Sequence, residues 1–122
     1  MTEEAKAPKY EFFVAGVKFH KLHTCINEIK VGDALRMVIE PTNRFDPNAV
    51  RLEFASVHLD ADVMVGYVPG TISASVAAAL TIQDLKAEVI EIDPDAKTWQ
   101  QLKVGIRAVS YTHLTLPTIL LV

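Results

Sequence analysis

Residues 35–54 read LRMVIEPTNRFDPNAVRLEF, and this stretch decides the fold. Apolar residues alternate with other residues on both sides of its centre, a pattern typical of strands with one buried face. Those expected on the buried faces are Leu35, Met37, Ile39, Val50, Leu52 and Phe54. Between the two runs, residues 41–48 contain two Pro, two Asn and one Asp, which favour a structured turn. The stretch therefore predicts two strands joined by an ordered turn, with Arg51 and Glu53 pointing outward.

The rest of the chain is predicted to add further short strands and one helix. The helix covers residues 73–80, where alanines are frequent and Ile72, Val76 and Leu80 recur at every fourth position. The additional strands are expected at residues 9–19, 63–68, 85–92 and 99–106. Because closing a sheet removes exposed edges, we expect a small, mainly β, closed barrel of about six strands with one or two short helices.

Composition places the chain among ordinary globular domains. It has 122 residues, of which 50% are hydrophobic and 22% charged, so overall disorder is excluded. The net charge of −3 argues against a surface that binds polyanions everywhere, but it leaves room for a local basic groove. No apolar run is long enough for a membrane span, no signal peptide is visible, and Cys25 is the single cysteine. These features predict a cytoplasmic protein that binds no membrane.

The two ends of the sequence differ from its middle. Residues 108–122 contain no Asp, Glu, Lys or Arg, and SYTHLTLPT at residues 110–118 matches a translated transposase sequencing adapter. We therefore interpret residues 108–122 as a non-native tail, with the adapter resemblance covering residues 109–122. Residues 1–8 are expected to form a flexible tail and residues 9–107 the domain. This interpretation leaves open that the natural protein continues beyond residue 107.

The turn also carries a family resemblance. Residues 40–50, EPTNRFDPNAV, resemble the signature of the HIRAN domain, in which an aromatic and an Asp precede Asn-Ala and a β-branched residue. Three further segments resemble the family in order and spacing: VAGVKFH at residues 14–20, VGDAL at residues 31–35, and VGYVP at residues 65–69. The resemblance covers about residues 10–106. It implies an OB-like barrel and nucleic-acid binding, and the best-understood members capture the 3′ end of single-stranded DNA.

The resemblance assigns roles by position. Phe45 would stack on the terminal base, Asp46 would accept a hydrogen bond from the 3′-hydroxyl, and Lys18 with Phe19 would form a basic-aromatic pair on the first strand. Stacking tolerates any base, and an ionised carboxylate can only accept hydrogen bonds, so both roles are chemically sound. Arg44, together with Lys18, Arg36 and Arg51, could supply contacts to the DNA backbone.

Structural roles for the same residues stay open. Asp46 and Asn48 could serve only the turn by accepting backbone N–H groups, as Asx turns do. Phe45 could instead fill the core. Phe12, Phe13 and Phe54 are assigned to the core, and Tyr67 and Trp99 to packing with one polar edge.

Enzymatic functions find less support in the sequence. His20, His23 and Cys25 lie close together in the sequence, but a zinc site needs four ligands and no nucleophile motif accompanies the thiol. We therefore predict no catalytic, metal or cofactor residues. The leading hypothesis is a non-enzymatic module that binds single-stranded DNA and its 3′ ends in DNA repair or replication-fork processing, with a helicase or nuclease domain as a partner lost by truncation. The alternative is a protein-interaction module on the same fold without useful DNA affinity.

Overall fold

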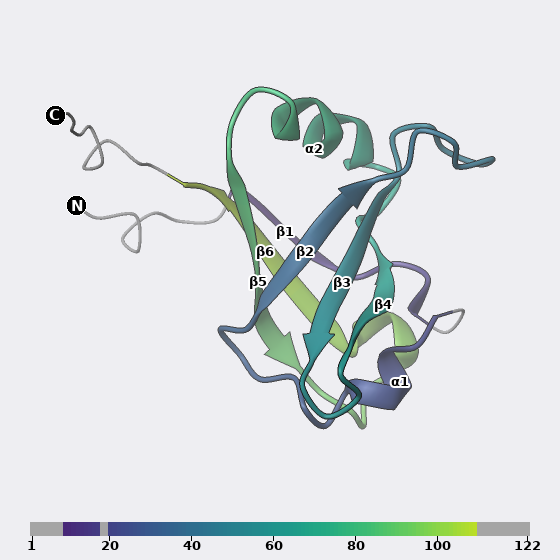
Figure 1. Ribbon diagram of the computed structural model, residues 1–122, viewed down its shortest axis with the longest axis vertical. Helices are drawn as coiled ribbons and strands as arrows, with labels where there is room; N and C mark the ends of the chain where they lie inside the picture. The colour runs from purple at the N-terminus through teal and green to yellow at the C-terminus, as the bar shows by residue number, and fades with distance from the viewer. Residues whose placement is uncertain (1–8, 18–19, 110–122) are drawn as a thin grey trace, which may run out of the picture.

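The computed structural model describes residues 9–17 and 20–109. It is mainly β, with six antiparallel strands in one sheet of order β1-β6-β5-β2-β3-β4 (Figure 1). The strands are β1 Tyr10–Phe13, β2 Ala34–Ile39, β3 Val50–Ser56, β4 Ala61–Tyr67, β5 Leu85–Ile92 and β6 Leu102–Ala108. The helices are α1 Leu22–Cys25, α2 Ser73–Leu80 and the short 3₁₀ helix η3 Thr98–Gln100. The predicted strand content and the helix at residues 73–80 are confirmed.

The sheet bends at β2 and so encloses its own core. β2 pairs with β3 from Arg36 to Ile39, but it pairs with β5 only through Ala34 and Leu35. Figure 1 shows the result: β2, β3 and β4 lie in front of β1, β5 and β6. The inner faces of the two layers supply most of the fully buried side chains, among them Leu52, Val65, Val89, Val104 and Ile106. The alternation in residues 50–54 therefore does face the core, as predicted.

The sheet is not closed into a barrel, and this part of the sequence-based prediction is wrong. β1 ends at Phe13 instead of continuing to residue 19, and the chain bends at Gly16, whose φ is 70°. Among the described residues, one bridge links the segment after β1 to β4, through two 2.9 Å backbone hydrogen bonds between Ala15 and Tyr67. A strand this short cannot pair along the whole edge of β4.

Gly66 allows this bridge to form. A Cβ atom at Gly66 would lie 2.5 Å from the carbonyl oxygen of Ala15 and 2.5 Å from Cγ1 of Val14. Both distances are shorter than side-chain packing tolerates, so the two segments approach this closely because no side chain separates them. The glycine in the VGYVP segment thus positions Tyr67 beside residue 15.

Several local expectations need correction. Trp99 is not in the last strand but in η3, where it is 62% exposed, so it does not pack in the core. Phe13 is only half-buried, and residues 20–30, which show no regular pattern, contain α1. Within the described residues, no helix is long and apolar enough to cross a membrane. The predicted tails are residues 1–8 and 108–122. All of these residues except Ala108, which ends β6, and Val109 lie outside the described part of the chain, so the domain boundaries stay predictions.

Candidate functional site

The loop of residues 40–49, between β2 and β3, is ordered by its own side chains. Asn43 Oδ1 accepts the backbone N–H groups of Phe45 and Asp46 at 2.9 and 3.0 Å. Asp46 Oδ1 accepts the N–H of Asn48 at 2.8 Å, and the carbonyl of Asp46 accepts the N–H of Ala49 at 2.9 Å. These are Asx-type turns, so the structural role considered for Asp46 is present. We call this segment the 40–49 loop.

The carboxylate of Glu40 anchors the loop to the sheet. Oε1 accepts hydrogen bonds from the Tyr67 hydroxyl at 2.8 Å and from Asn43 Nδ2 at 3.0 Å, while Oε2 accepts one from Arg51 at 3.0 Å. Burial raises the pKa of the Glu40 carboxyl, but these bonds and the Arg51 charge outweigh it, so the pKa lies below its ordinary value. Burial and the Glu40 charge raise the pKa of Tyr67. The two residues therefore form a charged acceptor and a protonated donor at neutral pH.

Asp46 ties the loop to α2. Its Oδ2 accepts the hydroxyl proton of Ser73 at 2.6 Å, and Ser73 is the first residue of α2 and only 2% exposed. Each carboxylate oxygen carries two acceptor sites, so one partner on each oxygen leaves capacity for another donor. The structural role therefore does not exhaust the chemistry of Asp46.

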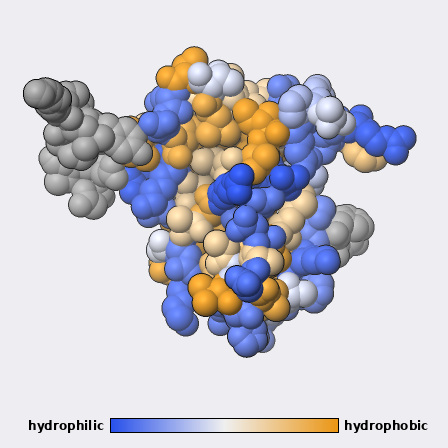
Figure 2. All heavy atoms as spheres, viewed as in Figure 1, coloured by the Kyte–Doolittle hydropathy of each residue, from blue (hydrophilic) through white to orange (hydrophobic). Residues whose placement is uncertain are grey.

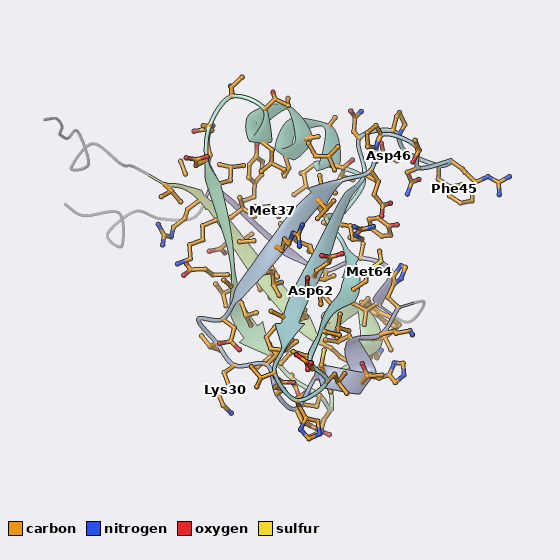
Figure 3. The ribbon with its side chains drawn as sticks, in the orientation of Figure 1. Lys30, Met37, Phe45, Asp46, Asp62 and Met64 are labelled. Carbon is orange, nitrogen blue, oxygen red and sulfur yellow. The ribbon has the colours of Figure 1, made fainter. Side chains whose placement is uncertain are left out.

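Phe45 projects from the tip of this loop into solvent (Figure 3). Its side chain is 95% exposed, which excludes the core role considered for it. An open pocket of about 290 Å³ lies beside it, and we call this the loop pocket; its lining residues are Ala15, Gly16, Asn43, Phe45, Asp46, Ala49, Tyr67, Val68 and Gly70. The lining residues that the structure describes include one carboxylate and no cationic side chain, so this part of the loop pocket suits an apolar or hydroxyl-bearing group better than a phosphate.

The predicted basic residues do not gather into one surface. Arg44 is exposed next to Phe45 and makes no hydrogen bond or ion pair with any described residue. Arg36 lies 3.4 Å from Asp62 and 4.0 Å from Glu53. Arg51 pairs with Glu40 and lies 2.8 Å from Glu53. Figure 2 shows hydrophilic side chains on the face of the sheet formed by β2 and β3. In the pairs of Arg36 and Arg51 with carboxylates, the opposite charges largely cancel.

The remaining predicted residues have separate outcomes. Lys18 and Phe19 lie outside the described residues, so their predicted DNA contacts stay predictions, as do those of the other assigned residues. Cys25 is 3% exposed, and burial followed by the Glu28 charge raises the pKa of its thiol. His23 is exposed, and the His20 ring meets the Tyr67 ring edge-on at 5.4 Å. Across the described residues, no three His, Cys, Asp or Glu side chains are placed to hold a metal ion.

Sequence reasoning missed one feature of this site and one elsewhere on the surface. The first is Glu40, which the pattern treats as the end of a strand and the structure uses as the anchor of the loop. The second is Trp99, whose exposed ring lies 5.4 Å from Lys97 Nζ. The sequence did contain a signal for this exposure. Lys97 lies two residues before Trp99 in a polar segment, and aromatic residues in cores rarely have charged neighbours.

The fold and the loop together define a small antiparallel β domain that presents an aromatic ring next to a carboxylate. The HIRAN domain family model matches residues 9–112, and the chain therefore belongs to the HIRAN domain family, which is known as a family of nucleic-acid-binding domains. The resemblance of residues 40–50 to the HIRAN signature is thereby confirmed as family membership.

Two solved structures share this fold. A protein from Lactobacillus plantarum superposes with a TM-score of 0.66 at 19% identity, over 82% of this chain and 91% of that one. The HIRAN domain of human HLTF superposes with a TM-score of 0.60 at 10% identity, over 81% of this chain and 73% of that one. At these identities the likeness establishes the fold alone. A comparison with curated proteins gives no significant match.

The Glu40 anchor predicts a pH-dependent stability. Glu40→Gln keeps an acceptor oxygen but removes the charge facing Arg51, so we expect the unfolding free energy at neutral pH to fall by about 1.5–3 kcal/mol. Because the native pKa of Glu40 is lowered from 4.5, the stabilisation is present above the unfolded-state pKa and is lost as pH falls through the native pKa. Urea denaturation of both proteins over a pH series should therefore give curves that converge in acid.

The matched control is Glu91→Gln, since Glu91 is 64% exposed and makes only a 3.7 Å pair with Lys103. We expect almost no change in stability at any pH from this variant. A Glu40→Gln effect no larger than that of Glu91→Gln would contradict the assignment of Glu40 as the anchor.

Proposed function

We propose that this domain is a non-enzymatic module that binds single-stranded DNA and captures its free 3′ end. The observation that carries the proposal is the 95% exposure of Phe45 on a loop whose backbone is held by Asn43 and Asp46. An apolar ring left in water on an ordered segment is ready to stack, because little conformational entropy remains to be lost on binding. Base stacking on an aromatic side chain contributes about 1–3 kcal/mol per base for any base.

The loop pocket supports a preference for a hydroxyl end. Asp46 is the one carboxylate in its lining and can accept a hydrogen bond from a 3′-hydroxyl, whereas a 3′-phosphate would meet like charge there. Arg44, beside Phe45, is suited to a phosphate one nucleotide back from the end. Trp99 with Lys97 offers the same combination of exposed ring and cation elsewhere on the surface. A module of this kind fits DNA repair or replication-fork processing, in which a helicase or nuclease domain acts on the captured end.

A second candidate is a protein-interaction module without useful DNA affinity. The observation that favours it is the pairing of Arg36 and Arg51 with Glu40, Glu53 and Asp62, which removes two cations from the surface expected to attract the DNA backbone. Under this alternative, no oligonucleotide would show salt-dependent binding to the domain.

The stacking role predicts a specific loss in a Phe45 variant. Fluorescence anisotropy with labelled single-stranded DNA at about 0.1 M salt should show Phe45→Ala binding about tenfold more weakly or worse. Phe45→Tyr should bind like the wild type, because the ring is retained. Phe45→Leu is the matched control for apolar area without a π-face and should fall near Phe45→Ala. Equal affinity for the leucine and tyrosine variants would rule out stacking as the role of this residue.

The end-capture role predicts a preference that depends on Asp46. The wild type should bind an oligonucleotide ending in a 3′-hydroxyl more tightly than one ending in a 3′-phosphate. Asp46→Asn keeps the shape of the turn but removes the charge, so the preference should shrink severalfold while binding to internal nucleotides persists.

Ser73→Ala serves as the control for that experiment. It removes the hydrogen bond to Asp46 Oδ2 and leaves the carboxylate in place, so it should keep the preference for the hydroxyl end. If Asp46→Asn discriminates between the two ends as well as the wild type does, the 3′-end role fails, even if DNA binding itself is observed.

A further inference from the structure

The end of the molecule opposite the 40–49 loop exposes several aliphatic side chains. Val57 is 88% exposed and Leu59 44% exposed in the turn between β3 and β4, and Val31 is 65% exposed in the turn before β2. Figure 1 places the β3–β4 turn at the lower end of the sheet, and Figure 3 places Lys30 near it, while Phe45 lies at the upper end. Isolated exposed aliphatics are ordinary, but three at one end of a small domain form a candidate contact surface.

The end of β3 also has an open side. Its pairing with β2 stops at Glu53, opposite Arg36, because β2 turns away there and its first two residues pair with β5. The last three residues, Phe54 to Ser56, pair only with β4 among the described strands. An open strand end is a template on which an extended chain can add backbone hydrogen bonds.

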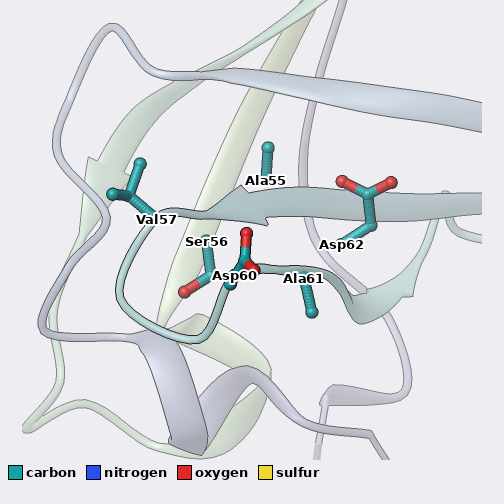
Figure 4. Close-up of a pocket in the computed structure, with 6 residues that line it drawn as sticks. All are labelled: Ala55, Ser56, Val57, Asp60, Ala61 and Asp62. Atoms are coloured by element: carbon teal, nitrogen blue, oxygen red, sulfur yellow. The ribbon is translucent and has the colours of Figure 1, made fainter.

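Two open pockets flank this strand end. One has a volume of about 380 Å³ and lies between β3 and the segment before β2, with Glu28, Lys30, Asp33, Ala34, Phe54, Ala55 and Val57 as its lining. The other, of about 430 Å³, is shown in Figure 4 and is lined by Ala55, Ser56, Val57, Asp60, Ala61 and Asp62. Ala55 and Val57 line both pockets, so the two form one continuous surface, which we call the β3-end surface.

The charge of the β3-end surface is negative. Its carboxylates are Glu28, Asp33, Asp60 and Asp62, whereas Lys30 is the one cationic side chain among the lining residues. Arg36 reaches Asp62 from β2, which still leaves four carboxylates against two cations. The pKa of the Glu28 carboxyl lies below its ordinary value. The hydrogen bond from the Ser56 hydroxyl lowers this pKa by more than burial raises it, and hydrogen bonds from the backbone N–H groups of Val57 and His58 lower it further. This group is therefore charged at neutral pH.

We infer that the β3-end surface docks an extended, basic segment of a protein partner, in which lysine or arginine side chains alternate with aliphatic ones. The open side of β3 supplies backbone partners, Val57 and Leu59 supply apolar contact, and the carboxylates select cations. Nucleic acid is disfavoured there by like charge. Since this surface and the 40–49 loop lie at opposite ends of the sheet, partner and DNA can bind together, and the inference does not rest on the proposed DNA binding.

The test uses a synthetic peptide of alternating lysine and valine, with a peptide of alternating glutamate and valine as its matched partner. Backbone amide shifts of the ¹⁵N-labelled chain report where each peptide binds. We expect the lysine peptide to shift residues 54–62 and 28–34 without shifting the 40–49 loop, and the glutamate peptide to shift neither region. Equal effects of the two peptides, or shifts centred on the 40–49 loop, would overturn the inference.

Three variants sharpen the test. Val57→Ser should weaken the lysine peptide about tenfold, whereas Ile82→Ser, at a side chain that is 81% exposed after α2, should have no effect. Asp60→Asn with Asp62→Asn should weaken it about threefold to fivefold at low salt, and asparagine tolerates the φ of 52° at residue 60. All four substitutions in these variants are at exposed positions, so the fold should persist. Unchanged peptide affinity for Val57→Ser would contradict the docking site, whatever the DNA measurements give.

Discussion

The carboxylate of Glu40 is the interaction on which the rest of the site depends. It joins three parts of the fold that are separate in sequence: Asn43 in the loop, Arg51 in β3 and Tyr67 in β4. Hydrogen bonds to a charged acceptor contribute about 1.5–3 kcal/mol each, more than neutral ones, and this carboxylate accepts three. Because Asn43 in turn holds the backbone of Phe45 and Asp46, the position of the exposed ring follows from the position of Glu40.

The same network explains why the outer face of the sheet is not the basic surface that the arginines suggested. Arg51 is committed to Glu40 and Glu53, and Arg36 to Asp62 and Glu53. These pairs stabilise the loop anchor and the β2–β3–β4 layer. Arg44, which directly precedes Phe45, has no such pair among the described residues. If the domain binds DNA as proposed, recognition is therefore concentrated at the tip of the 40–49 loop instead of spread over a groove, and the acidic opposite end is available to a different partner.

Much of the fold could be predicted because local pattern determined it. Apolar residues alternate along residues 50–54 and 85–92 and recur at every fourth position around residues 73–80. Each of these patterns lies within a single strand or helix, so the sequence alone shows it. That the sheet stays open could not be predicted, because it depends on β1 ending at Phe13. After β1 the chain bends at Gly16, and Gly66 lets it approach β4 at Ala15. The same limit applies to Arg36 and Arg51, because the sequence identifies outward positions but not which carboxylates share that face.

For the site itself, the turn sequence pointed to Phe45 and Asp46 but left open whether each has a structural or a binding role. Asp46 serves the turn, through Asn48 and Ser73, and retains acceptor capacity, so the two alternatives were not exclusive. Phe45 could be placed in solvent only by the structure, because aromatic residues in turns occur both in cores and on surfaces. The opposite error was made for Trp99. It was assigned to the last strand and expected to pack, whereas it lies in η3 with its ring exposed.

The site as described requires that the 40–49 loop is ordered before any ligand binds. The most direct measurement is ¹⁵N relaxation together with amide hydrogen exchange at Phe45 and Asp46 in the free protein. Since the amides of Phe45 and Asp46 both donate to Asn43 Oδ1, we predict backbone order parameters of about 0.85 for these two residues and measurable protection of their amides from exchange. This should hold although the Phe45 side chain is exposed. Order parameters below about 0.6 with unprotected amides would show that the loop is not ordered in the free protein.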